Sequence, residues 1–312
     1  MPLFLQPVFQ ERIWGGRALE AFNYDIPNDH TGECWAISAH PNGPNVITNG
    51  KYQGENLENV WAQDKALFGV DHDEKFPLLT KILDANDKLS VQVHPNDAYA
   101  QQHEGEYGKT ECWYILDAKE DAEIIYGVNA QNQDELNQMI DNQQFETLFN
   151  HVKVKPGDFF YVPAGTVHAI GEGILILETQ QSSDTTYRIY DYERKDKNGE
   201  QRALHLEQSK AVINLSSESP NTEPQHDIVQ EQAYTQFVSN AFFTVGRWNI
   251  NGSLIYHMPQ SYCLVSVVEG NGEVEIDQNT YQLNKGTHFI LTTEDQHIKF
   301  TGEMTLIISY VS

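Results

Sequence analysis

The chain has 312 residues, a formal charge of -25 at pH 7 and 39% hydrophobic residues. Its length allows a full apolar core and about two domains, since most domains run to about 100–200 residues. The acidic balance argues against nucleic acid and anionic membranes as partners, because the summed field of the protein repels both. We therefore expect a small molecule as the ligand.

The cysteines and the N-terminal segment indicate a cytoplasmic protein with reduced thiols. Cys34, Cys112 and Cys263 are odd in number and far apart in the sequence, which does not suit a disulfide framework. Residues 1–6 lack the basic region and the apolar stretch of a signal peptide. No apolar run approaches the roughly 18–20 residues that span a bilayer, so no membrane role is expected.

The first element with a chemical signal is a strand over residues 88–94, which follows a helix predicted over residues 57–68. Because side chains alternate along a strand, Ser90, Gln92 and His94 share one face and the valines between them share the other. A polar face inside a closed barrel needs a reason, such as a ligand or a metal. This face is therefore a candidate site.

Glu111 stands at the head of the next strand, predicted over residues 111–116. A carboxylate that leads into a buried strand is costly unless it is paired or binds a cation. Lys109 lies two residues earlier, so it shares the face of Glu111 if this segment is extended. A further strand is predicted over residues 122–128, and two short helices separated by a break are predicted over residues 132–149.

Residues 157–168 combine a strand, a tight turn and a histidine. Gly157 follows a proline in a turn, and the Phe-Phe-Tyr-Val run after it has the composition of a buried strand. Pro163 and Gly165 then reverse the chain before His168. This spacing of Gly, Pro-x-Gly and His resembles the second conserved motif of the cupin β-barrels.

The polar residues of these strands predict one metal site. His94, Glu111 and His168, with the side-chain oxygen of Gln92, make a donor set of nitrogen and oxygen atoms. Such a set, with room for water or substrate, suits catalytic zinc, and from chemistry alone Mn²⁺ and Fe²⁺ also remain open.

Strands over residues 173–179 and 186–190 follow, and the second of them contains Arg188 between aromatic residues. Five of the chain's 20 Lys and Arg residues lie close together here: Arg188, Arg194, Lys195, Lys197 and Arg202. The two lysines are interpreted as solvated residues of a hairpin. Arg188 is expected to pack its aliphatic stem and direct its charged head.

Residues 216–225 contain Pro, Ser and charge without apolar anchors, which predicts a linker. It would join a metal-binding domain at residues 1–215 to a C-terminal β domain at residues 226–312. Gly286 begins a weak echo of the earlier glycine motif, but Leu-Thr-Thr stands where Pro-x-Gly is needed. The second domain is therefore expected to be degenerate and metal-free.

At these residues the chain resembles the class I mannose-6-phosphate isomerases, in particular their short bacterial branch. The resemblance covers nearly the whole chain and rests on WGG at 14–16, GECW at 32–35, HP at 40–41, QVHP at 92–95, KTE at 109–111, PAGTVHA at 163–169 and SDTTYR at 183–188. It implies a mainly β fold of cupin-type β-barrel or jelly-roll domains with a few short helices. It also implies one zinc ion per chain and the interconversion of mannose 6-phosphate and fructose 6-phosphate.

The resemblance assigns roles residue by residue. The four zinc ligands of the family are matched by Gln92, His94, Glu111 and His168, and its catalytic arginine is matched by Arg188. Positions that hold the substrate phosphate are matched by Lys81 and Ser90, with Arg194 as a further candidate.

Two departures from the longer members of the family limit what can be transferred. Those members carry His-Lys-Pro-Glu where this chain has Gly-Lys-Thr-Glu at residues 108–111. Any role of that histidine, such as opening the sugar ring, cannot be carried over. Their large helical insert is reduced here to about residues 132–149.

The implied reaction moves a proton between C1 and C2 of the sugar through a cis-enediol intermediate, whose negative charge zinc stabilises as a Lewis acid. Arg188 adds a fixed positive charge and is a poor base, because its guanidinium stays protonated. Near zinc and Arg188 the pKa of Lys109 is expected to fall, giving a neutral amine that shuttles the proton. In the alternative, Lys109 only binds substrate charge and a water or a carboxylate carries the proton.

Two other functions remain open at this point. One is a non-catalytic, metal-containing cupin that senses a sugar, which would need neither Lys109 nor Arg188. The other is a cupin oxygenase that uses Fe²⁺, against which a fourth protein ligand at Gln92 and the phosphate-binding cations weigh. We expect a monomer whose partner is a phosphorylated hexose.

Overall fold

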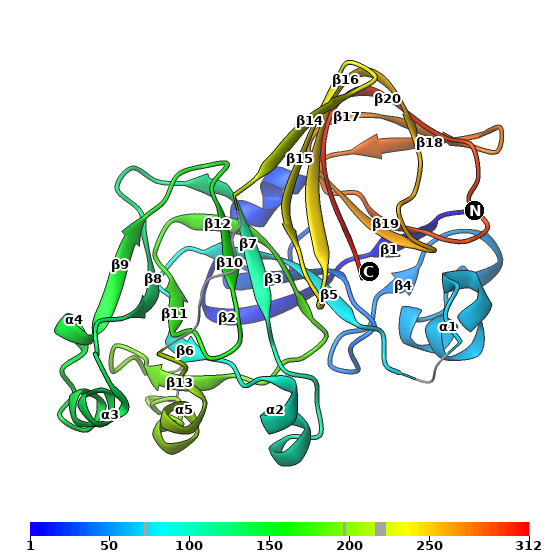
Figure 1. Cartoon of the computed structure of the whole chain (residues 1–312). Coiled ribbons are helices and arrows are strands. Elements are labelled where there is room, and N and C mark those ends of the chain that lie inside the picture. The colour runs from blue at the N-terminus through cyan, green and yellow to red at the C-terminus, as the bar shows by residue number, and fades with distance from the viewer. Residues whose placement is uncertain (72–73, 196–197, 216–222, 312) are drawn as a thin grey trace.

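The computed structural model describes residues 1–71, 74–195, 198–215 and 223–311. They form a mainly β structure of three antiparallel sheets, with short helices at its edges (Figure 1). In the strand pairing of the described residues, none of the three sheets closes on itself. The mainly β fold predicted from the sequence is confirmed, and the expected barrels are built from open sheets.

The six-stranded sheet is the middle layer of the molecule. Its strands, in spatial order, are β10 (Phe159–Val162), β7 (Glu111–Ala118), β12 (Ile174–Gln181), β5 (Leu78–Ala85), β3 (Thr31–Ile37) and β2 (Val8–Gly16). All eight residues of β12 and all eight of β5 are buried, because both faces of this sheet are covered. One face packs against C-terminal residues such as Phe237 and Leu264, and the other faces the five-stranded sheet.

The five-stranded sheet is formed by β13 (Tyr187–Tyr190), β6 (Val91–Val93), β11 (His168–Ile170), β8 (Glu123–Val128) and β9 (Phe149–Lys153). Ile124 and Ile170 pack with Ile115 and Ile176 of the six-stranded sheet, which fixes the two sheets face to face. The outer face is covered by helices, which are α3 (Gln133–Asp141), α4 (Phe145–Leu148) and α5 (Leu206–Val212).

The helices agree in part with the sequence. The two short helices predicted over residues 132–149 are confirmed as α3 and α4, and Asn132 caps α3 by accepting a hydrogen bond from the Glu135 amide at 2.9 Å. The helix predicted over residues 57–68 is divided into α1 (Leu57–Gln63) and the 3₁₀ helix η3 (Lys65–Phe68). Four helices of the described residues were not predicted. They are the α-helices α2 (Asp97–His103) and α5 and the 3₁₀ helices η1 (Ala18–Phe22) and η2 (Gly50–Tyr52).

The third sheet contains the C-terminal strands and two strands from the beginning of the chain. Its order is β14 (Gln225–Val229), β15 (Gln232–Ser239), β16 (Thr244–Tyr256), β20 (Ile298–Tyr310), β17 (Cys263–Ile276), β19 (His288–Leu291), β1 (Leu3–Gln6) and β4 (Val46–Ile47), with β18 (Asn279–Asn284) beside β17. The N-terminal strand thus completes the sheet of the C-terminal part. Most of the predicted linker, residues 216–222, lies outside the described residues, and the domain boundaries stay a prediction.

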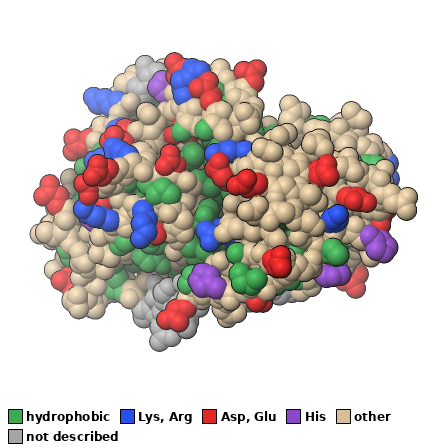
Figure 2. Space-filling view, turned by 90° about the horizontal axis from the view of Figure 1, so that it is seen from above, with side chains coloured by type: hydrophobic (Ala, Val, Ile, Leu, Met, Phe, Trp, Pro, Cys, Tyr) green, Lys and Arg blue, Asp and Glu red, His purple; other side chains and the backbone are tan. Residues whose placement is uncertain are grey.

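The molecular surface carries charges of both signs. Figure 2 shows acidic and basic side chains interspersed on the face seen from above, without a continuous basic area. Among the described residues, no helix has the length and apolar composition needed to cross a membrane.

Candidate metal centre and active-site cleft

The five-stranded sheet carries a row of predicted site residues across three neighbouring strands. Arg188 of β13 pairs with Gln92 of β6, and Gln92 pairs with His168 of β11. Residues paired in this way point to the same side of a sheet. The valines on either side of Gln92 are buried in the core on the opposite side, so the predicted alternation is confirmed within β6. The strand is shorter than the predicted range 88–94, and Ser90 and His94 lie just outside its ends.

The six-stranded sheet presents a second row. Trp113 of β7 pairs with Glu178 of β12, Glu178 pairs with Lys81 of β5, and Lys81 pairs with Trp35 of β3. Glu111 lies two residues before Trp113 on the same strand and therefore points the same way. The pairing thus gathers residues that lie far apart in the sequence on the inner face of this sheet.

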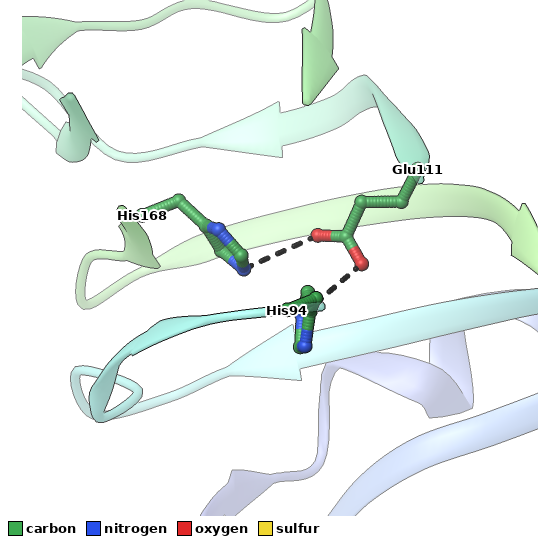
Figure 3. Close-up of side chains that lie close together, drawn as sticks. All are labelled: His94, Glu111 and His168. Atoms are coloured by element: carbon green, nitrogen blue, oxygen red, sulfur yellow. Dashed lines mark ion pairs between the residues drawn. The ribbon is translucent and has the colours of Figure 1, made fainter. Parts of the chain in front are cut away.

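His94, Glu111 and His168 converge from three segments of the chain (Figure 3). Glu111 Oε2 lies 3.5 Å from His94 Nε2, and Glu111 Oε1 lies 3.3 Å from His168 Nε2. All three side chains are buried, and their ligand-type atoms lie within 4.8 Å of one another. Within the described part of the chain, this is the one group of three or more His, Cys, Asp or Glu residues that could hold a metal ion.

Hydrogen bonds on the far side of each imidazole ring fix the nitrogen that faces Glu111. His94 Nδ1 lies 2.9 Å from Thr185 O, and His168 Nδ1 lies 2.9 Å from Thr166 O. A carbonyl oxygen only accepts, so Nδ1 carries the proton in both rings and Nε2 presents a lone pair. Burial lowers the pKa of His168 to about 4 and the pKa of His94 well below its ordinary value, so both rings are neutral at pH 7. Two neutral imidazoles and a carboxylate fit a divalent metal ion.

Gln92 lies at the edge of this group. Its Nε2 atom is 3.4 Å from His168 Nε2. A half-turn of the amide exchanges its nitrogen and oxygen, and only the oxygen is a metal ligand. Gln92 as a fourth ligand therefore stays a prediction.

Lys109 lies beside the donor atoms, in agreement with its two-residue spacing from Glu111. Its Nζ atom is 3.1 Å from Glu111 Oε2 and 3.2 Å from His94 Nε2. Burial alone would lower the pKa of this ammonium group, but the charges of Glu111 and Glu178 outweigh burial and raise the pKa above its ordinary value. The lowered pKa expected from the sequence depends on a bound zinc ion and stays a prediction. Without the charge of that ion, the two carboxylates that border the amine set the direction, and Arg188 is hydrogen-bonded to Ser90.

The two rows line a cleft of about 400 Å³, and six of the nine predicted site residues face it: Lys81, Ser90, Gln92, Lys109, His168 and Arg188. Arg188 Nε donates to Ser90 Oγ at 3.2 Å, and its Nη1 donates to Ala203 O at 2.9 Å. Burial, followed by the charge of Arg202, lowers the pKa of Arg188 from its ordinary value. The cleft therefore combines metal-type donors with cations, an arrangement that suits an anionic, oxygen-rich ligand.

Lys81 shares a buried carboxylate with a residue that the sequence did not single out. Arg12 Nε and Nη2 donate to the two oxygens of Glu33 at 3.0 and 3.1 Å, and Lys81 Nζ lies 3.9 Å from Oε2. The Trp35 indole donates to the same oxygen at 2.7 Å, and its ring lies 4.7 Å from Lys81 Nζ. Burial alone would raise the pKa of Glu33, but Lys81 and Arg12 hold it at about 2.

Arg194 and Arg202 share a second buried carboxylate, Asp191. Arg194 Nη2 lies 2.5 Å from Asp191 Oδ1, and Arg202 Nε and Nη2 donate to the same carboxylate at 2.8 and 2.6 Å. Arg202 lines the cleft, whereas Arg194 does not. The role of Arg194 in holding a phosphate stays a prediction.

Glu178 is a cleft residue that the sequence reasoning missed. Its Oε2 atom accepts a hydrogen bond from the Trp113 indole at 3.1 Å, and its buried Oε1 atom has no hydrogen-bond partner among the described residues. Burial, followed by the charge of Glu111, raises the pKa of Glu178 to about 7. The available signal was a carboxylate inside the apolar strand ILILETQQ, the same signal that pointed to Glu111.

A larger hollow of about 780 Å³ lies beside β8 and β9, where Phe145, Tyr190 and Glu193 are among its lining residues. It contains none of the predicted metal ligands. The smaller cleft is therefore the better candidate for the chemistry, because donor atoms, cations and buried titratable groups meet there.

Comparison with known proteins covers almost the whole chain. Residues 3–133 match the family model described as phosphomannose isomerase type I, catalytic domain, and residues 233–311 match mannose-6-phosphate isomerase, cupin domain. The chain is 51% identical to the mannose-6-phosphate isomerase ManA of Bacillus subtilis, over 99% of each sequence. It is 52% identical to a mannose-6-phosphate isomerase of Streptococcus mutans, over 99% of this chain and 98% of that protein.

Solved structures agree with these matches. The crystal structure of the mannose 6-phosphate isomerase from Bacillus subtilis superposes with a TM-score of 0.96 at 46% identity, and 99% of each chain is covered. A mutant phosphomannose isomerase from Salmonella typhimurium superposes with a TM-score of 0.81 at 17% identity, covering 100% of this chain and 99% of that one. At that identity the second likeness concerns the fold alone.

Proposed function

The chain belongs to the type I phosphomannose isomerases, and from this premise we propose that it interconverts mannose 6-phosphate and fructose 6-phosphate with one zinc ion per chain. The supporting observation is that His168 of the metal-type donor set lines one cleft together with Lys109, Glu178 and several further cations. The ligand-type atoms of His94 and Glu111 lie within 4.8 Å of that of His168. An aldose–ketose isomerase needs these parts, because it must move a proton, stabilise a developing oxyanion and hold a phosphate.

His94, Glu111 and His168 would hold the zinc ion, with the amide oxygen of Gln92 as the fourth ligand. The carbonyl groups of Thr185 and Thr166 keep both imidazole rings in the orientation that ligation requires. When bound, zinc supplies a Lewis acid beside the reacting oxygens of the sugar.

Arg188 stabilises the cis-enediol intermediate of the sugar in this proposal. Its guanidinium stays protonated and is oriented by Ser90 and by the carbonyl group of Ala203. A fixed positive charge at the cleft wall lowers the energy of an anionic oxygen without having to reorient during the reaction.

Glu178 and Lys109 are proposed to move the protons. Glu178 Oε1 is buried at the cleft and free of hydrogen bonds from the described residues, so it can accept the proton from one sugar carbon and return it to the other. Lys109 holds a proton at Nζ and exchanges it with a sugar oxygen. Two neighbouring groups with opposite proton preferences are a common basis for acid–base catalysis at neutral pH.

The phosphate group is proposed to lie against Lys81 and Ser90, with Arg194 as a further predicted contact. In a chain with a charge of -25, a local group of cations is needed for a dianion to remain bound. Binding energy from the phosphate then orients the reacting end of the sugar. The cytoplasmic location and the monomeric state stay predictions.

Turnover of mannose 6-phosphate by the zinc-loaded protein tests this function. We expect fructose 6-phosphate to form in a coupled assay, and Arg188→Ala to lower kcat by roughly 10²–10³-fold while the zinc content stays at the wild-type level. Arg17→Ala, at an exposed arginine, is the matched control and should leave kcat unchanged. Bound zinc without turnover of mannose 6-phosphate would instead indicate a sugar-sensing protein.

A further inference from the structure

Three arginines gather around the segment that follows β13. Arg194 and Arg202 both contact the buried carboxylate of Asp191, and Arg194 has a second, exposed partner in Asp87 at 3.4 Å. Arg188 donates to the carbonyl group of Ala203, the residue next to Arg202. No carboxylate of the described residues forms an ion pair with Arg188. Among these groups, three guanidinium groups stand against two carboxylates, Asp191 and Asp87, in a chain that is strongly acidic overall.

Arg202 and Arg194 differ in what they face. Arg202 lines the cleft together with Ser90 and Arg188. Arg194 is engaged elsewhere, because its Nη1 atom donates to Lys88 O and its guanidinium lies 5.2 Å from the centre of the Tyr192 ring. The same carboxylate thus holds one arginine at the cleft and one outside it.

Asp191 binds only one edge of the Arg202 guanidinium. The bonds run from Nε and Nη2, and Nη1 has no hydrogen-bond partner within the described part of the chain. Because the guanidinium is planar and rigid, a carboxylate on one edge fixes the direction of the remaining N–H donors. Arg202 is thereby pre-oriented to donate to a second anion.

The neighbouring positive charges of Arg188 and Arg202 favour an anion beside Arg202. Arg202 contributes, after burial, to the lowered pKa of Arg188, which indicates that the two guanidinium groups repel each other. Ser90 Oγ, which accepts from Arg188 Nε at 3.2 Å, adds a hydroxyl group at the same wall. A phosphate dianion beside Arg202 would relieve the repulsion and accept hydrogen bonds from Arg202 Nη1 and from the Ser90 hydroxyl group.

From this geometry we propose that Arg202 contacts the phosphate group of the substrate and that Asp191 is the positioning residue that directs Arg202 into the cleft. The inference rests on the function proposed above and deepens it, because it adds to Lys81 and Ser90 a residue that favours a phosphorylated hexose over the free sugar. Arg188 keeps its role at the reacting end, and Arg202 extends the positive wall toward the phosphate.

Steady-state kinetics of the zinc-loaded full chain test the proposal through Arg202→Gln. We expect KM for mannose 6-phosphate to rise roughly 10- to 100-fold, the range that corresponds to one charge-assisted hydrogen bond, while kcat changes by less than about threefold. Turnover of free mannose, measured in parallel at high sugar concentration, should be the same in the variant and the wild type. Arg202→Lys should recover part of the KM, because it keeps the charge and loses the planar donor geometry.

Matched variants separate a local contact from a general effect. Lys153→Gln removes the same charge at an exposed site and should leave KM unchanged. Asp191→Asn should raise KM in the same direction as Arg202→Gln, and an unchanged KM would overturn its positioning role. Arg194→Gln measures the competing assignment: a larger rise in KM than that of Arg202→Gln would overturn the proposal. Circular dichroism and thermal unfolding check that each variant is folded.

Calorimetric binding of mannose 6-phosphate to the wild type and Arg202→Gln separates this inference from the proposed function. A wild type that binds the sugar without isomerising it would contradict the proposed function, and the ratio of the two Kd values would still test Arg202. A Kd at least tenfold weaker in the variant supports the contact. Equal Kd and equal KM in an active enzyme would overturn the inference alone.

Discussion

The two β regions of this chain bury different residues on the inner faces of their sheets. Between the five-stranded and six-stranded sheets, the buried side chains include Lys109, Glu111, His168 and Glu178, which face a cleft or a neighbouring ligand-type atom. The interior of the third sheet, the nine-stranded sheet that contains the C-terminal strands, is built mainly from apolar side chains. Both regions have the same strand alternation, so the inward positions decide what each region can do.

Histidine shows the difference most clearly. His168 points its Nε2 at the carboxylate of Glu111, whereas His288 lies 2.6 Å from the Tyr24 hydroxyl and 2.9 Å from the Ser266 hydroxyl. Burial lowers the pKa of both rings, to about 4 and about 3, so both are neutral at pH 7. A neutral buried histidine therefore acquires a function only from the groups that share its space.

Replacing one histidine in each region should give the largest difference in activity between two matched variants. His168→Gln should lower kcat/KM by at least about 10³-fold, because a metal ligand and the Lewis acid it holds are lost. His288→Gln should keep the zinc content and kcat and change only the unfolding midpoint. Zinc analysis and kinetics on both variants decide this, and comparable losses of activity would contradict the division of roles.

Deleting apolar volume from the second region should affect stability without affecting chemistry. Leu306 is fully buried in the core of the nine-stranded sheet. Leu306→Ala should lower the free energy of unfolding by about 2–5 kcal/mol, because it leaves a cavity. Urea unfolding measures this loss. At 25 °C kcat should stay within about twofold of the wild type, and a tenfold loss of kcat in a fully folded sample would show that the two regions are coupled.

Glu33 tests whether a polar interior also contributes to stability. Its folded pKa is about 2, below the ordinary value of 4.5, so its ionised form stabilises the fold above pH 4.5. That contribution is lost as the pH falls from about 4.5 through about 2. We expect Glu33→Gln to lower the free energy of unfolding by about 3 kcal/mol at pH 7, since Arg12 and Lys81 lose their shared partner.

The effect of Glu33→Gln on the free energy of unfolding should become smaller as the pH falls. On acidification the wild type loses the stabilisation from Glu33, whereas the variant has no such stabilisation to lose. The difference between their free energies of unfolding should therefore be about 2 kcal/mol smaller at pH 3 than at pH 7. Urea unfolding at pH 7, 4 and 3 measures it. A difference that stays constant with pH would show that the charge of Glu33 does not stabilise the fold.

Residues with local signals could be predicted from the sequence. Strand alternation identified the shared face of Ser90 and Gln92, and a glycine-proline turn identified the strand that leads to His168. A carboxylate at the head of an apolar strand identified Glu111. Each of these signals lies within about ten residues of the side chain that it predicts.

Residues that depend on pairing between distant strands were missed. Glu178 faces the cleft because β12 pairs with β7 and β5 in one particular register. The residues near Glu178 in the sequence do not predict that register. Arg202 reaches the cleft through its bond to Asp191. The effect of Glu178 on the pKa of Lys109 was missed for the same reason, since Glu178 lies 69 positions away in the chain and yet borders its amine.

The most direct test of whether the cleft between the five-stranded and six-stranded sheets is the active site is a zinc titration. Zinc is added stepwise to chelator-treated protein, and turnover of mannose 6-phosphate is measured at each step. We expect chelation to abolish turnover, activity to return linearly with added zinc, and a break at one zinc ion per chain. Glu111→Gln should show neither the break nor the activity. Full turnover after complete removal of zinc, or one tightly bound zinc ion with no turnover, would contradict this assignment.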